Sequence, residues 1–216
     1  MGISVQENPE LFYILDGWLA PSKDKETYNF SLQEAELLRI PIQYCTGLRT
    51  VIQAGGNIGV FPRILADVFQ TVYTVEPDEL NFLAVQHNTA MCQNVHALRA
   101  AFGYDRIKGS VVESIPGNAS AYQVVPGDEF DVIRVDDLNV QDCDLLLLDV
   151  EGYEYFAVQG AMETIERSSP VICLEMKKFF VKKYRVLIKD IYRLMSEIGY
   201  VEKKVIESRD HVFVRR

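Results

Sequence analysis

The sequence predicts an α/β protein in which helices cover both faces of a doubly wound, mostly parallel sheet of seven strands. Strand-like and helix-like segments alternate from Arg49 onward, as they do where crossover helices join parallel strands. The segment 144–150 contains the run Leu145-Leu146-Leu147-Leu148, typical of a strand that is buried on both faces. The last two strand-like segments are too close in sequence for a crossover, so we expect an antiparallel C-terminal hairpin at the sheet edge.

Each expected strand is a run of apolar and β-branched residues bounded by turn residues. The expected strands are 50–54, 71–76, 95–102, 144–150, 170–175, 200–207 and 211–215. The expected helices are 32–40, the segment from a glycine turn to about residue 69, 79–92, 154–167 and 180–198. The first helix begins with capping-box spacing at Ser31 and Glu34 and should stop at Pro41. Pro62 falls in the first turn of the second helix, where its missing N–H costs little.

Two segments lie outside this alternation. Residues 1–45 form an N-terminal extension in our interpretation, and they could cover a site in the single domain formed by residues 46–216. Residues 105–140 are interrupted by Gly109, Pro116, Gly117, Pro126 and Gly127. We interpret this second segment as an inserted hairpin or loop near the functional site.

Composition narrows the class of function. The formal net charge is -9, which makes the chain a poor generic binder of nucleic acid. Residues 177–216 nevertheless hold 12 basic and 5 acidic side chains, and we favour a solvated helix face over an anion-binding surface as the explanation. With no apolar run long enough for a membrane span and no signal-peptide pattern at the N-terminus, we expect a cytoplasmic protein. The four cysteines lack the spacing of a zinc site, and no metal is implied.

The first candidate site is the segment Gln53-Ala54-Gly55-Gly56-Asn57-Ile58-Gly59, between the strand 50–54 and the next helix. Gly55 permits a tight turn and a close approach of the backbone to a ligand, and Gly59 lets the helix start close to the sheet. A plain strand–helix turn would explain these residues equally well. Glu76 favours a site, because it ends the next strand 17 residues after Gly59 and a carboxylate there can accept both hydroxyls of a ribose. Asp78 is more simply read as the N-cap of the following helix.

The second candidate site is Asp149-Val150-Glu151-Gly152, at the carboxyl end of the apolar strand. Ligands of open α/β sheets bind outside these strand ends. Two carboxylates, Asp149 and Glu151, would lie there on the same side, and Gly152 allows a sharp exit of the chain. The alternative is that Asp149 caps the next helix and Glu151 is solvated. We favour a functional pair, because placing two charges at a buried strand end needs a reason.

These segments resemble the FkbM family of S-adenosylmethionine-dependent methyltransferases, which have a Rossmann-like methyltransferase fold and methylate hydroxyl oxygens, often on sugars or polyketide-derived rings. The resemblance spans about residues 48–176 and is most specific at Asp149-Val150-Glu151-Gly152. Its matching segments are Gln53–Gly59, Val75–Asp78 with Asn81, Phe82 and Asn88, Asn94-Val95, Val135–Leu138, and Asp149–Gly152 with Glu154, Val158, Gly160 and Ala161. The family usually has an acid at the position of Gln53, which helps to hold the ammonium group of the cofactor; this sequence keeps an oxygen acceptor there without the charge.

The resemblance implies S-adenosyl-L-methionine as the cofactor and a hydroxyl group of a small molecule or glycan as the methyl acceptor. The cofactor-binding residues would be Gln53, Gly55, Gly56, Asn57 and Gly59 for the methionine part, Glu76 for the ribose, and Ala101 and Phe102 for the adenine. Asp149 and Glu151 would be the catalytic pair, binding the acceptor hydroxyl and taking its proton. We expect neither a nucleic acid nor a membrane as a partner.

Two alternative functions stay open at this point. An NAD-dependent oxidoreductase would share the alternating pattern, but its GxGxxG motif has a different spacing from Gly55-Gly56-Asn57-Ile58-Gly59. A non-catalytic Rossmann-like interaction domain is favoured only by Gln53. A nucleic-acid amino-methyltransferase is disfavoured, because Asp149-Val150-Glu151-Gly152 stands where its Asp/Asn-Pro-Pro-aromatic motif would follow the apolar strand.

Overall fold

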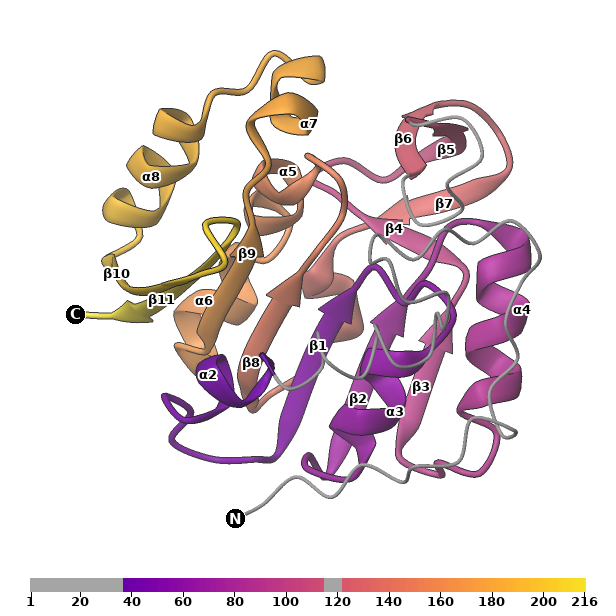
Figure 1. Ribbon diagram of the computed structural model, residues 1–216, viewed down its shortest axis with the longest axis horizontal. Coiled ribbons are helices and arrows are strands. Elements are labelled where there is room, and N and C mark those ends of the chain that lie inside the picture. The colour runs from indigo at the N-terminus through magenta and orange to yellow at the C-terminus, as the bar shows by residue number, and fades with distance from the viewer. Residues whose placement is uncertain (1–36, 115–121) are drawn as a thin grey trace.

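The computed structural model describes residues 37–114 and 122–216, and a seven-stranded sheet lies at its centre (Figure 1). The strands of this sheet are β1 (Thr50–Ala54), β2 (Thr71–Val75), β3 (Val95–Leu98), β8 (Cys143–Leu148), β9 (Val171–Glu175), β10 (Tyr200–Ile206) and β11 (Asp210–Arg215). Their order is β10-β11-β9-β8-β1-β2-β3. The five strands from β9 to β3 are parallel, and β11 runs antiparallel to both β9 and β10. The predicted parallel sheet with a C-terminal hairpin at its edge is confirmed.

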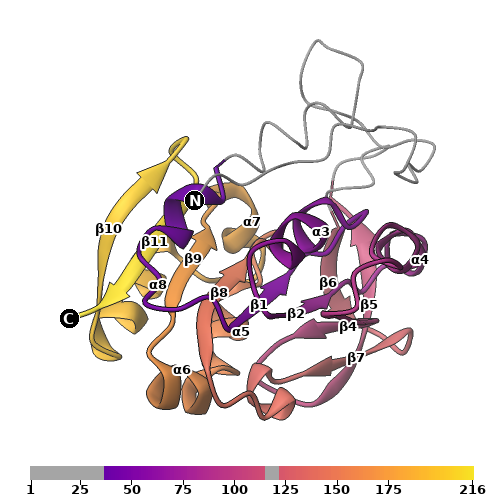
Figure 2. The same ribbon diagram turned by 90° about the horizontal axis from the view of Figure 1, so that it is seen from below.

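Helices cover both faces of the sheet (Figure 2). They are α2 (Arg39–Ile42), α3 (Val60–Ala66), α4 (Glu79–Asn88), α5 (Glu154–Gln159), α6 (Met162–Ser168), α7 (Lys178–Lys183) and α8 (Ile188–Glu197). Alternate residues of β8 point to opposite faces, as the pleat of a strand requires. Leu145 and Leu147 pack with residues of α2, α3 and α4, whereas Leu146 and Leu148 pack with residues of α5, α6, α7 and α8. All six residues of β8 are buried, as the apolar run predicts.

A β-bulge at the amino end of β8 sets its register against β1. Thr50 is paired with Cys143, but Val51 is paired with Leu145, so Asp144 is the extra residue. The Asp144 carboxylate accepts hydrogen bonds from the backbone N–H (2.7 Å) and the Nε (3.0 Å) of Arg49. This contact joins the start of β1 to the start of β8, at the amino ends of the strands, whereas the candidate sites lie at their carboxyl ends.

A second sheet follows β3, in the order β4-β7-β5-β6. Its strands are β4 (Ala100–Phe102), β5 (Ile107–Glu113), β6 (Tyr122–Pro126) and β7 (Phe130–Ile133). The antiparallel pairing of β5 with β6 confirms an inserted hairpin, and Pro116 and Gly117 lie outside the described residues. The prediction of one strand over 95–102 is wrong. Burial alternates up to Leu98 and becomes continuous from Ala100 onward, because the chain passes from the edge of the main sheet into the second sheet.

Three predicted helices differ from the observed ones. The helix over 154–167 is broken at Gly160, where a Cβ would lie 2.0 Å from the carbonyl oxygen of Gly103, so the chain is pressed against β4 and turns. The helix over 180–198 is broken near Arg185, whose φ is +60°. The helix over 79–92 ends at Asn88.

At the N-terminal end of the described chain, α2 includes Pro41 instead of stopping there. Proline is tolerated in the first turn of a helix, because the N–H that it lacks would have no partner within the helix. The rest of the helix expected over 32–40, and most of the expected extension 1–45, lie outside the described residues.

Candidate functional site

The candidate site lies at the carboxyl ends of β1, β2, β8 and β9. From β1 the chain proceeds outward through β2 and β3 on one side, whereas β8 and β9 lie on the other side. Strand order therefore reverses between β1 and β8, and ligands of open α/β sheets bind in the crevice at such a switch point. Both sequence motifs end at this crevice, the glycine segment after β1 and Asp149-Val150-Glu151-Gly152 after β8.

The glycine loop, Gly55 to Gly59, is held by the ends of the neighbouring strands. Gly55 has φ +87°, and a Cβ on it would lie 2.0 Å from the carbonyl oxygen of Asp149, so only glycine fits there. The N–H groups of Gly55 and Gly56 both donate to the carbonyl oxygen of Val75, at 3.1 and 3.0 Å. The loop after β1 is thus joined to β2 by hydrogen bonds and to β8 by close packing.

The same loop is anchored at its far end. Gly59 has φ +91°, and a Cβ there would be 3.1 Å from the Cα of Val85 in α4, so α3 begins in close contact with α4. The Asn88 side-chain amide donates to the carbonyl oxygen of Ile58 at 2.6 Å. Asn57 has φ +47°, a conformation that asparagine tolerates better than most residues.

Gln53 lies beneath the loop and is fully buried. Its Nε2 donates to the carbonyl oxygens of Ala54 (3.0 Å) and Gly55 (2.7 Å), and its Oε1 accepts from the hydroxyl of Thr74. Both ends of the amide are therefore engaged within the protein. The observed contacts of Gln53 hold the turn after β1 against β2. Its predicted contact with a cofactor stays a prediction.

Glu76 follows β2 and faces the glycine loop. One carboxylate oxygen accepts the N–H of Asn57 at 2.7 Å and the other accepts the N–H of Asp78 at 3.0 Å. Its side chain is buried, which raises the pKa of Glu76 to about 8 although the two backbone N–H groups oppose that rise. Asp78 accepts from the N–H of Asn81 at 2.9 Å, so its predicted role as the N-cap of α4 is confirmed.

The ends of β8 and β9 bring a group of three carboxylates together. Asp149, Glu151 and Glu175 each have a carboxylate oxygen within 4.8 Å of the others. The Lys177 ammonium lies among them, 3.3 Å from Oε1 of Glu151 and 2.7 Å from Oε2 of Glu175. We call these four residues the carboxylate cluster. Asp149 does not cap α5: its N-cap is Tyr153, and that helix has no side-chain cap.

Glu154 holds the loop that carries Glu151. It is fully buried, and its Oε1 accepts the N–H groups of Val150 and Gly152, both at 3.1 Å. Glu151 lies between those two residues with φ +51°, and Gln123 of β6 donates to its carbonyl oxygen at 3.1 Å. The inserted hairpin therefore contacts the site, as the sequence predicts.

Burial and like charge shift the protonation of this region. Burial, followed by the neighbouring Asp149, raises the pKa of Glu151 to about 7, and Lys177 only partly opposes this. Burial also raises the pKa of Glu154 to about 8 and that of Glu175 well above its usual value. For Lys177, burial alone would lower the pKa, but the three carboxylates outweigh it and the pKa is raised. The cluster can therefore exchange protons near neutral pH.

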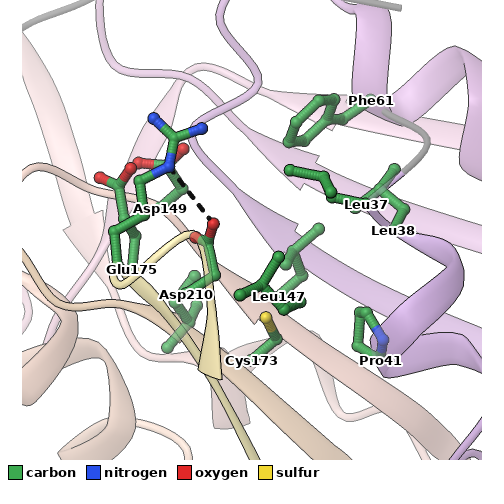
Figure 3. Close-up of a pocket in the computed structure, with 12 residues that line it drawn as sticks. Leu37, Leu38, Pro41, Phe61, Leu147, Asp149, Cys173, Glu175 and Asp210 are labelled. Carbon is green, nitrogen blue, oxygen red and sulfur yellow. Dashed lines mark ion pairs between the residues drawn. The ribbon is translucent and has the colours of Figure 1, made fainter. Parts of the chain in front are cut away.

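A pocket adjoins the carboxylate cluster on the side of β9 (Figure 3). Asp149 and Glu175 lie on one side of it, and Leu37, Phe61 and Leu147 lie on the other. Its full lining is Leu37, Leu38, Pro41, Phe61, Leu147, Leu148, Asp149, Cys173, Glu175, Ile206, Arg209 and Asp210.

The model of the FkbM methyltransferase domain matches residues 53–202, which is well over half of the chain and includes both motifs. The chain belongs to the FkbM methyltransferase family. A comparison with curated proteins gave no match.

Solved structures show the same fold. The FkbM methyltransferase of Methylobacillus flagellatus is 17% identical with a TM-score of 0.50, over 85% of this chain and 52% of that one, so this chain spans about half the length of that relative. Magnesium protoporphyrin IX methyltransferase of Synechocystis, solved with bound S-adenosylmethionine, is 14% identical with a TM-score of 0.50, over 87% and 79% of the two chains. Precorrin 8w decarboxylase of Methanobacterium thermoautotrophicum is 10% identical with a TM-score of 0.51, over 96% and 98%.

Ala101 and Phe102, the residues predicted to lie beside the adenine of an FkbM cofactor, are buried in β4. Their exposed fractions are 4% and 1%, and Phe102 belongs to the core that packs against α5 to α8. Both residues are packed into the interior of the protein. Their contact with adenine stays a prediction.

Another segment of the FkbM resemblance has a structural role. The Asp136 carboxylate accepts the N–H groups of Glu163 and Thr164, at 3.2 and 2.8 Å, and so holds the start of α6. Asp137 forms an ion pair with Arg106 of the second sheet.

Glu175 and Lys177 were not among the predicted site residues. Glu175 ends the expected strand 170–175, so the rule that singled out Glu76 and Asp149 would have found it. Lys177 has no such signal, because it begins a basic stretch that is explained equally well as a solvated helix. Among the described residues, no helix is long and apolar enough to cross a membrane.

Proposed function

We propose that this protein transfers a methyl group from S-adenosylmethionine to a hydroxyl oxygen of a small molecule or sugar. The observation that carries the proposal is the direct contact between the glycine loop and the carboxylate cluster, through Gly55 and Asp149, at the switch point of the sheet. A cofactor held by the loop would thus lie beside groups that can bind a hydroxyl and accept its proton.

The residues after β1 and β2 fit the cofactor. A carboxylate has about four acceptor positions, and the N–H groups of Asn57 and Asp78 and the side chain of Asn81 use three of them, which leaves one for a ribose hydroxyl. Gly55, Gly56, Asn57 and Gly59 would contact the methionine part through their backbone. We keep Ala101 and Phe102 as the residues nearest the adenine, and Gln53 as a cofactor-binding residue near the ammonium group, in addition to its observed contacts within the turn.

The bound cofactor supplies an electrophilic methyl group, so the protein must align the acceptor oxygen and remove its proton. Asp149 and Glu151 would accept a hydrogen bond from the acceptor hydroxyl and take the proton as the methyl group is transferred. The pKa of Glu151 is raised to about 7, so this group is partly protonated near neutral pH, and we assign proton removal mainly to Asp149 and acceptor binding to Glu151. An alcohol is far less acidic, so we place proton removal within the transfer step rather than before it.

Calorimetry on the full chain tests the proposal, with S-adenosylhomocysteine and NAD as separate ligands. We expect S-adenosylhomocysteine to bind and to raise the melting temperature, because a ligand of the native state stabilises it by mass action. Binding of NAD alone would indicate an oxidoreductase. A folded sample that binds neither ligand at millimolar concentration would indicate a non-catalytic domain.

A further inference from the structure

The pocket beside the carboxylate cluster and the glycine loop both reach Asp149. The loop packs on Asp149 from the side of β1, and the pocket reaches Asp149 between β8, β9 and α2. One residue therefore borders both regions. If the proposed function holds, a molecule in this pocket would meet the transferable methyl group at Asp149.

Most of the pocket wall is apolar. Leu37, Leu38 and Pro41 contribute the wall around α2, Phe61 comes from α3, and the remaining apolar residues lie on β8, β9 and the end of β10. Figure 3 shows the apolar side chains gathered away from Asp149 and Glu175. Such a surface stabilises the apolar body of a ligand by removing it from water.

The charged groups at the pocket are mainly acidic. Asp149, Glu175 and Asp210 line it, and Arg209 is the one basic residue of the lining. The Arg209 guanidinium lies 3.5 Å from the Asp210 carboxylate and 3.4 Å from that of Glu207. The nearby Lys177 ammonium is engaged by Glu151 and Glu175. An anionic ligand would therefore have to displace existing ion pairs and also lie against carboxylates, which costs free energy.

We infer that this pocket receives the methyl acceptor, and that the acceptor is an uncharged or cationic molecule with an apolar body rather than a phosphorylated or carboxylated one. The inference rests on the proposed function and narrows its substrate class. The hydroxyl end of the acceptor would lie at Asp149, which lines the pocket and borders Glu151 in the carboxylate cluster, and its apolar body would lie between Phe61 and Leu147.

Three probes that share a cyclohexyl ring and differ in their polar group test this inference: cyclohexylmethanol, cyclohexylmethylamine and cyclohexanecarboxylate. Each is titrated into the full chain, with and without saturating S-adenosylhomocysteine, and followed by NMR of the leucine and isoleucine methyl groups. We expect the alcohol and the amine to bind at millimolar concentration and to shift the signals of Leu147 and Ile206. The carboxylate should bind at least tenfold more weakly.

Matched variants locate the binding. Leu37→Ala removes a pocket wall and should weaken cyclohexylmethanol several-fold, whereas Leu83→Ala, the same change on the exposed face of α4, should not. Asp149→Asn replaces the carboxylate by an amide of the same size. It should reduce the difference in affinity between the alcohol and the carboxylate probes. Equal binding of the carboxylate and the alcohol would overturn the inference, as would failure of all three probes to bind.

The two failures are distinguishable. Probes that fail while S-adenosylhomocysteine binds would leave the proposed function standing with its acceptor site elsewhere. Binding of cyclohexylmethanol at Leu147 without any binding of S-adenosylhomocysteine would count against methyl transfer and leave the pocket's preference for uncharged ligands intact.

Discussion

The glycine loop after β1 and the carboxylate cluster after β8 and β9 lie side by side but are held in different ways. In the glycine loop, backbone N–H groups have nearby acceptors, as in the bonds from Gly55 and Gly56 to the carbonyl oxygen of Val75 and from Asn57 to the carboxylate of Glu76. In the carboxylate cluster, three acids lie close together with one ammonium among them, and Oε2 of Glu151 is buried without a hydrogen-bond partner among the described residues.

The difference separates a preformed binding loop from a site that carries unfavourable charge. Backbone hydrogen bonds set the geometry of the loop before any ligand arrives, which lowers the entropy lost on binding. The raised pKa values of Glu151 and Glu175 show that the folded protein keeps protons there which a solvated carboxyl would release. We therefore expect changes in the loop to affect folding and cofactor binding, and changes in the cluster to affect turnover.

The largest expected effect is on turnover. Asp149→Asn keeps the size of the side chain but removes its basicity, so methyl transfer should fall by roughly 10²–10⁴-fold. Affinity for S-adenosylhomocysteine should stay within a few-fold, and Glu151→Gln should show a smaller loss, chiefly in acceptor binding. Turnover, affinity and melting temperature are measured on the same preparations. A stable and fully active Asp149→Asn would remove Asp149 from the chemistry.

Gly55→Ala should damage both regions at once. A Cβ at this residue would lie 2.0 Å from the carbonyl oxygen of Asp149, so the loop and β8 must separate. We expect a loss of about 2–4 kcal/mol in the free energy of unfolding, measured by urea denaturation. Gly199→Ala is the matched control, because Gly199 has φ +82° but nothing within 4 Å of its Cβ position. Similar losses in the two variants would show that backbone conformation, and not the contact with β8, matters at Gly55.

Glu76→Ala should weaken the binding of S-adenosylhomocysteine at pH 9, where Glu76 with its pKa of about 8 is charged, by about 1.5–3 kcal/mol, the range for hydrogen bonds to a charged group. The loss corresponds to roughly 10- to 150-fold in Kd by calorimetry. Glu76→Gln keeps an oxygen for the N–H of Asn57 and should lose less. If Glu76→Ala binds normally, the ribose is held elsewhere and the comparison between the two regions fails.

The pH dependence of stability tests the burial of Glu154. With the pKa of Glu154 at about 8, the folded protein holds a proton between about pH 4.5 and 8 that the unfolded chain has released, so stability falls as pH rises through that window. Glu154→Gln cannot release that proton, so its melting temperature should fall less than that of the wild type between pH 5 and pH 8. Glu79→Gln, at the exposed start of α4, is the control, and an equal slope in wild type and Glu154→Gln would contradict the burial argument.

The sheet, its C-terminal hairpin and the position of both motifs could be predicted from sequence, because each depends on local pattern. Strand runs, the glycine turn and Glu76 all lie where the alternation places them. The division of 95–102 between two sheets and the break at Gly160 could not be predicted, because both depend on the contact between β4 and the segment after α5. The contact between Gln53 and Thr74, a partner 21 positions away, could not be predicted either.

The bulge at Asp144 has a consequence at the other end of β8. Because side chains alternate along a strand, one inserted residue exchanges the faces of every position that follows it. Without Asp144, Leu147 would turn toward α5 to α8, and the carbonyl of Asp149 would no longer meet Gly55. The contact between Gly55 and Asp149 therefore depends on the bulge at the amino end of β8, where Arg49 binds the extra residue, Asp144. Deletion of Asp144, far from the candidate site, would therefore exchange the two buried faces of β8.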